Sequence, residues 1–198
     1  ETHIRDWMCK KLTSSHPKST DLVSYFRFDE ASGDSLYNLA GTNHGKLTNM
    51  DTSTAWKVSG AAIGDSSIYT TSLPGLLDLS HMDGDKIRYS TAGSHDMVQL
   101  YLVNEPAINY ATSDPTRLKA DTSRHWGMFV SGSDGSTHIM SYYYNSNSNL
   151  SAYNEPSLIF FQRANGSDTD WTASSFTTTR NTTTNILKVS GISNNFEF

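Results

Sequence analysis

The chain has 198 residues, with 15 Lys and Arg against 20 Asp and Glu, and its formal net charge is −5 at pH 7. This length suits one large β domain, or one domain with part of another, and is enough to bury a substantial core. Because the basic residues are spread singly, they concentrate no positive field, so we expect neither nucleic acid nor an anionic membrane surface as a partner. No apolar run approaches the roughly 20 residues of a membrane-spanning helix, and we expect no membrane insertion.

The first predicted elements are a helix and a strand. Ile4, Trp7, Met8 and Leu12 recur at helical spacing behind Thr2 as a candidate N-cap, which predicts one short N-terminal helix. The run at 22–28, "LVSYFRF", leaves few polar gaps, which predicts a strand covered on both faces.

Short strands separated by turn residues fill the rest of the chain. Asp83-Gly84 is typical of a tight hairpin turn between "LLDLS" and "KIRYS", and Ser133-Asp134-Gly135 predicts a second hairpin. Further strands are predicted in "DMVQLYLV", "SLIFFQR" and "NILKVSG", and "ASSFTTTRNTTTN" reads as a loop or an edge. The pattern predicts an all-β fold, an antiparallel, jelly-roll-like β-sandwich with one N-terminal helix.

Catalytic signatures are scarce. Asp29 and Glu30 are adjacent, so on a strand they would point to opposite faces, whereas a glycosidase needs two carboxyl groups facing one cleft. We therefore interpret them as turn residues. Asp168 and Asp170 have the right period but lie in a loop-like stretch. The seven histidines show no zinc-binding spacing, and no Gly-x-Ser-x-Gly elbow or phosphate-binding glycine loop is present, so we expect no enzyme.

The single cysteine, Cys9, excludes an internal disulfide and a multi-cysteine metal site. Calcium is the one metal with candidate ligands, because Asp83 and Asp85 offer loop carboxylates, although a plain hairpin turn explains the same residues. Ligand-binding candidates are aromatic: Tyr142 and Tyr144 share one strand face, and Trp171 lies in a polar stretch.

The stretch "LVSYFRFDEASGDSLYNLAGTNHGKLTN", followed by "W" and "SGAAIGD", resembles a segment of laminin-G-like, concanavalin A-type jelly-roll repeats in large secreted proteins of Bacteroidetes bacteria. The resemblance covers roughly residues 4–65, and the remainder looks like the β-rich segment that follows such repeats. It implies residues 1–64 as the helix plus the laminin-G-like segment and 65–198 as a β-sandwich, with the option that the two pack as one unit.

The resemblance also implies a function and a location. We expect a non-catalytic binding, adhesion or spacer module of a larger secreted or surface-exposed bacterial protein, beside neighbouring domains, with a polysaccharide or cell-surface glycan as one candidate ligand. The chain starts at Glu1, which is typical of a mature product or an excised fragment. The alternative is a glycan-active hydrolase or lyase of the concanavalin-like sandwich class, which requires two facing carboxyl groups.

Overall fold

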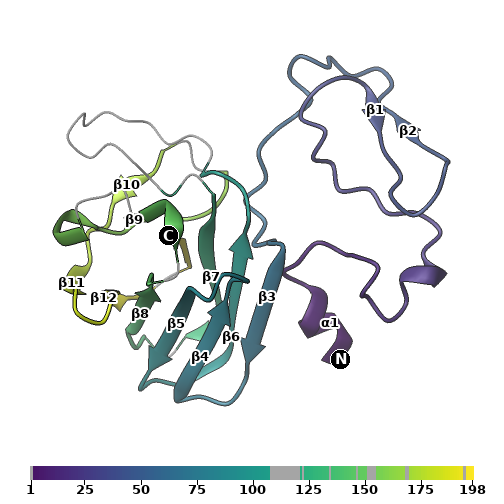
Figure 1. Cartoon of the computed structure of the whole chain (residues 1–198). Coiled ribbons are helices and arrows are strands. Elements are labelled where there is room, and N and C mark those ends of the chain that lie inside the picture. Colours follow the sequence, from purple (N-terminus) through teal and green to yellow (C-terminus); the bar gives the residue numbers. More distant parts are fainter. Residues whose placement is uncertain are drawn as a thin grey trace. The chain divides into compact units, whose positions relative to one another are not determined.

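The computed structural model describes residues 2–107, 121, 123–133, 135–145, 147–150, 155–167, 170–193 and 195–198. The chain divides into two compact units (Figure 1): unit 1 contains Glu1–Lys10 and Gly60–Phe198, and unit 2 contains Lys11–Ser59. Within the described part of the chain, no helix has the length and apolarity that a membrane crossing requires.

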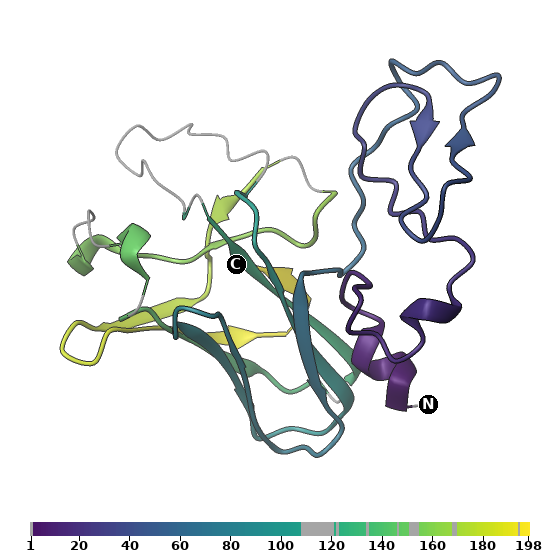
Figure 2. The same ribbon diagram turned by 45° about the vertical axis from the view of Figure 1, so that its right-hand side comes forward.

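Unit 1 is built around two antiparallel sheets (Figures 1 and 2). The five-stranded sheet has the order β11 (Thr177–Asn181), β12 (Ile186–Ile192), β8 (His138–Tyr143), β5 (Lys86–Thr91) and β4 (Gly75–Ser80). The four-stranded sheet has the order β13 (Phe196–Glu197), β7 (His125–Ser133), β6 (His95–Val103) and β3 (Ser66–Thr70). The predicted all-β antiparallel sandwich is confirmed.

Smaller elements complete unit 1. They are α1 (Thr2–Trp7), the strand pair β9 (Phe161–Gln162) and β10 (Thr172–Ala173), and the 3-10 turns Ser148–Leu150 and Glu155–Ser157. The predicted helix exists but ends at Trp7, five residues before Leu12, the last residue of the apolar pattern. The stretch that reads as a loop or an edge supplies β11, which lies at the edge of its sheet.

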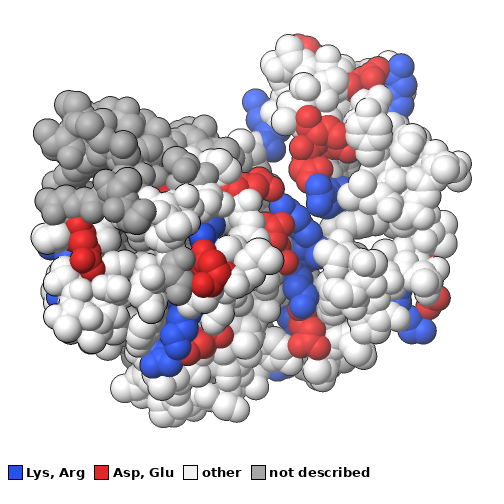
Figure 3. Space-filling view, viewed as in Figure 1, with Lys and Arg blue, Asp and Glu red and all other residues white. Residues whose placement is uncertain are grey.

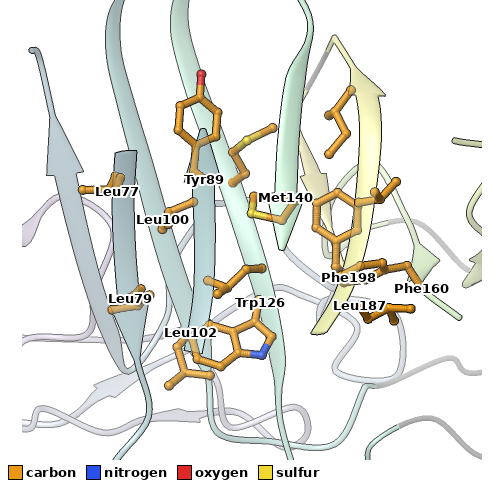
Figure 4. Close-up of a cluster of buried hydrophobic side chains, with 14 of the residues drawn as sticks. Leu77, Leu79, Tyr89, Leu100, Leu102, Trp126, Met140, Phe160, Leu187 and Phe198 are labelled. Atoms are coloured by element: carbon orange, nitrogen blue, oxygen red, sulfur yellow. The ribbon is translucent and has the colours of Figure 1, made fainter. Parts of the chain in front are cut away.

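The core lies between the two sheets, because both sheets contribute to one cluster of buried side chains (Figure 4). Leu79, Tyr89 and Met140 come from the five-stranded sheet. Leu100 and Trp126 come from the four-stranded sheet. Each large apolar side chain buried in this way contributes about 1.5–3 kcal/mol to folding, so the cluster is the main source of cohesion in unit 1.

The outer face of the four-stranded sheet is also covered. Leu100 points into the core, so its neighbours Gln99 and Tyr101 must point outward, yet they are 0% and 3% exposed. Backbone bonds hold the covering chain in place, because Gly64 N donates to Cys9 O at 2.9 Å and Asp65 N donates to Leu102 O at 2.7 Å. The side chains on this outer face are therefore held in a partly enclosed space.

The segment 133–135 corrects one prediction. It joins β7 to β8, but β7 pairs with β6 and β13 in one sheet, while β8 pairs with β5 and β12 in the other. The expected hairpin is therefore a crossover between the two sheets. The Asp83-Gly84 hairpin is confirmed, since β4 pairs with β5 and Gly84 has φ 97°.

The structure of unit 2 shows that a second prediction, the strand over residues 22–28, is wrong. Its strands are β1 (Ser35–Leu36) and β2 (Gly45–Lys46), with a 3-10 turn at Ser19–Asp21, and no strand covers 22–28. Val23 is 89% exposed, and Phe28 has a positive φ of 59°, which lies outside the β region of backbone conformations. Among residues 11–59, all of which are described, Asn38 alone is buried, so unit 2 has no apolar core.

Candidate functional site

The turn between β4 and β5 brings the two metal candidates together with a cation. Asp83 and Asp85 sit on either side of Gly84, and Arg124, which precedes β7, reaches both of them. Its Nη2 donates to Asp83 Oδ2 at 2.7 Å, and its Nη1 donates to Asp85 Oδ1 at 3.0 Å. Arg124 Nη1 also lies against His81 Nδ1. We call these four residues the turn cluster.

Hydrogen bonds extend the turn cluster across the sandwich. Tyr142 OH donates to the second oxygen of Asp85 at 2.5 Å, so both oxygens of this fully buried carboxylate are engaged. Asn147 Nδ2 donates to Tyr142 OH at 2.6 Å and to Asp121 Oδ2 at 2.5 Å. Asp85, Tyr142, Asn147 and Asp121 thus each have a hydrogen-bond partner in this network, as burial requires.

The two carboxylates of the turn cluster titrate in opposite directions. Burial, followed by the neighbouring Asp83, raises the pKa of Asp85 to about 6. The pKa of Asp83 lies well below its ordinary value because hydrogen bonds from Arg124 and other neighbours outweigh its desolvation. Both directions fit the geometry, since Asp85 is fully buried whereas Asp83 remains partly open to water.

The side chains of His81, Asp83 and Asp85 place one ligand atom each within 4.8 Å of one another, a spacing that suits a metal ion. The guanidinium of Arg124, however, already lies between these ligand atoms as a resident cation. A calcium ion would have to displace Arg124, which is 6% exposed. The turn cluster in this state is an internal ion-pair network, and these residues do not fit a resident calcium ion.

The three aromatic candidates are placed in the interior of unit 1. Tyr144 is 6% exposed and donates to Glu155 Oε1 at 2.7 Å, and Tyr142 is engaged in the turn cluster network. Trp171 is 5% exposed and stacks on Arg163, whose Cζ lies 4.4 Å from the ring centroid. A ligand would need to displace packed neighbours to reach these rings.

A second cluster of buried charged side chains lies on the outer face of the four-stranded sheet, that is, on the side away from the core. Glu197 on β13 accepts from Arg163 Nε at 2.5 Å and from Tyr101 OH at 2.9 Å, and both charged residues are at most 5% exposed. His125 Nε2 lies 3.9 Å from the same carboxylate, and burial lowers the pKa of this histidine. The carboxylate of Glu197 is thus shared among three neighbours and fixes the Tyr101 ring.

Above this cluster the outer face opens into a cleft of about 600 Å³. Tyr101 lies at its buried base and Phe129, which is half-buried, lies beside it. The remaining lining residues are all uncharged: Gly60, Ala61, Ala62, Met128, Val130, Ala164, Asn165, Ser193 and Asn195. We call this hollow the outer cleft. Among the residues that the structure describes, it mixes apolar surface with a few polar groups and has no charged residue in its lining, which is the usual make-up of a site for a neutral small ligand.

The described carboxylates provide no facing catalytic pair at the outer cleft, because none of them lines it. Asp29 pairs with Arg27 at 2.6 Å, and Glu30 accepts from Tyr37 N at 2.8 Å, so both stabilise the loops of unit 2, as a turn role predicts. Asp168 lies outside the described residues, and Asp170 is exposed. Burial raises the pKa of the Cys9 thiol to about 11, so this thiol is protonated and unreactive at neutral pH.

Acidic and basic side chains lie interspersed on the face of unit 1 in Figure 3. Among the ion pairs of unit 1, Asp78 accepts from Lys86 Nζ at 2.9 Å and from Arg88 Nε at 2.6 Å. On this face, Lys and Arg side chains thus lie next to carboxylates.

Sequence reasoning missed the residues of the outer cleft. Tyr101 sits within a strand of otherwise apolar residues, and Asn165 and Asn195 lie in polar stretches that resemble ordinary loops. A partial signal existed in the alternation of β6, which predicts that Tyr101 points away from the core side of Leu100. Comparison with protein-family models, curated proteins and solved structures gave no match.

Proposed function

We propose that this chain is a non-catalytic extracellular binding module of a larger surface protein, and that its ligand is an uncharged carbohydrate held in the outer cleft. The observation that carries this proposal is the lining of the outer cleft, which combines aromatic and neutral polar groups. Its volume of about 600 Å³ falls within the ordinary range for small-ligand sites.

The chemistry of the lining favours a sugar over other small molecules. Sugars present apolar C–H faces and hydroxyl edges, which suit an aromatic ring beside amide and hydroxyl groups. The described lining residues include no Lys or Arg, which disfavours phosphates and carboxylates, because proteins bind these with charged donors. The rigid base, fixed by Glu197 and Tyr101, lowers the entropic cost of ordering the site on binding.

A non-catalytic role is supported by the state of the buried carboxylates. Asp85 and Glu197 are each engaged by an arginine and a tyrosine, and neither lines the outer cleft. A glycosidase needs one carboxyl group free to donate a proton and another free to act on the same bond. The described carboxylates offer no such pair in the cleft.

The test is thermal unfolding of the purified chain with a panel of neutral polysaccharides and oligosaccharides, because a ligand that binds only the folded state raises the melting temperature. We expect a rise with at least one sugar and its loss in Phe129→Ala. The control is Phe28→Ala, which removes an exposed phenyl ring from unit 2 and should leave the rise unchanged.

Two outcomes would contradict the proposal. No rise with any sugar would favour a spacer without a ligand. Release of reducing ends or unsaturated products from the panel would instead show a glycan-active enzyme.

A further inference from the structure

The two asparagines that line the outer cleft are each held in place through the oxygen of the side-chain amide. Asn195 Oδ1 accepts from the backbone N–H of Val130 at 2.7 Å. Asn165 Oδ1 accepts from the backbone N–H of Ser167 at 2.9 Å and from the Ser167 hydroxyl. A backbone N–H can only donate, so these contacts identify the oxygen of each amide and fix its orientation.

The consequence is that the two amide oxygens are used within the protein, while the two NH2 groups are not. Neither Asn165 Nδ2 nor Asn195 Nδ2 makes a hydrogen bond to the described residues. Both asparagines are lining residues of the outer cleft, together with Ser193. The described lining therefore includes two amide NH2 groups that are uncharged donors, beside a serine whose hydroxyl can donate or accept.

A small apolar wall accompanies these donors. Ala61 and Ala62 line the cleft directly after Gly60, and a Cβ at Gly60 would lie 2.7 Å from Asn165 Oδ1, so the 60–62 segment runs beside this amide. Ala164 borders the same amide in sequence and also lines the cleft. Small apolar residues thus share the lining of the outer cleft with the Asn165 amide.

We propose that the outer cleft is selective for sugars that carry an acetamido group, that is, N-acetylated hexosamines. The acetamido carbonyl is an acceptor without a charge, which matches an uncharged NH2 donor, and its methyl group matches the alanine wall. A plain hexose has hydroxyl groups in that position and places a polar group against the alanines. This inference rests on the proposed function, because it names the ligand of the same cleft.

The experiment is titration calorimetry with the trimer of β-1,4-linked N-acetylglucosamine and with the trimer of β-1,4-linked glucose. We expect the acetylated trimer to bind at least about tenfold more tightly, the value of one hydrogen bond with its apolar contact. Asn165→Asp and Asn195→Asp each keep the acceptor oxygen that holds the loop but remove the NH2 donor. At least one of them should abolish the preference for the acetylated trimer.

Asn181→Asp is the matched control, because Asn181 Oδ1 likewise accepts from two backbone N–H groups, at 3.0 and 3.1 Å, on an exposed turn away from the cleft lining. Its affinities should equal those of the unchanged chain. Equal binding of both trimers, or a preference that survives both Asp variants, overturns the acetamido inference while leaving a carbohydrate module intact. If no sugar of the wider panel binds either, the proposed function fails as well.

Discussion

The ring of Tyr101 lies across the backbone of Gly127 on the neighbouring strand, and its hydroxyl reaches Glu197 on the next strand beyond. Tyr101, Gly127 and Glu197 face one another in register, so one side chain spans three strands of the four-stranded sheet. The glycine has no Cβ, and the ring occupies the space that a Cβ would need. This relationship fixes the base of the outer cleft.

Gly127→Ala is therefore expected to destabilise unit 1 by about 2–3 kcal/mol, because the added methyl group must displace the Tyr101 ring or the strand. Denaturant unfolding measures this change. In a Tyr101→Ala background the same substitution should cost much less, since the ring is gone. Equal costs in both backgrounds would show that Tyr101 does not set the requirement for glycine.

Glu197→Gln should cost about 3–5 kcal/mol of unfolding free energy, because it leaves the buried guanidinium of Arg163 without its carboxylate. The amide oxygen can still accept from Tyr101, so the loss isolates the charge. The control is Asp78→Asn, where the pairs with Lys86 and Arg88 are about one-third exposed and should be worth about 1 kcal/mol or less. Similar losses for both variants would contradict the picture of a buried, desolvated pair.

Stability should depend on pH through Asp85. Its folded pKa of about 6 lies above the ordinary 3.8, so between these values the folded protein binds more protons than the unfolded chain. The contribution of this group therefore falls as pH rises from about 4 to about 6, by about 2–3 kcal/mol in total. The difference in unfolding free energy between the unchanged chain and Asp85→Asn should follow that slope. A difference that is flat across this range would contradict the raised pKa.

Arg124→Gln should destabilise unit 1 by a few kcal/mol, because Asp83 and Asp85 then face each other without a cation. It should also change the response to metal. The unchanged chain should show no rise in melting temperature with calcium at the turn cluster, whereas the variant should regain stability in calcium and lose it again in chelator. A calcium-dependent rise in the unchanged chain that disappears in Asp83→Asn would show that the ion displaces Arg124.

The sandwich was predictable from sequence because its strands alternate strongly and are separated by turn residues. Two local patterns led to wrong predictions. In each, the pairing of a strand depends on residues that are distant in the sequence. The apolar run 22–28 has strand composition but no partner strand, and Phe28 adopts a positive φ. Gly135 has a φ of 81°, as expected of a glycine in a turn. Turn residues, however, do not indicate whether the next strand returns to the same sheet.

The candidate site was much less predictable. Asp83 and Asp85 could be grouped from sequence because they lie two residues apart. Arg124, which neutralises them, comes from a segment 39 residues after Asp85. The outer cleft likewise combines residues 60–62, Tyr101, Phe129 and Asn165 with residues near the C-terminus, so only the folded chain brings them together.

The division of the chain into units has a practical consequence. Unit 1 consists of two separate stretches of sequence. They are held together next to the place where the chain leaves unit 1, because Lys10 forms a β-bridge with Gly64 and Gly64 N donates to Cys9 O. Residues 11–59 thus form an insertion whose two ends lie close together. The entropic cost of closing such a loop rises only slowly with its length. The insertion is therefore suited to deletion and replacement. Unit 1 should fold when a short glycine-serine linker replaces residues 11–59, and also when another domain with adjacent termini is inserted in their place.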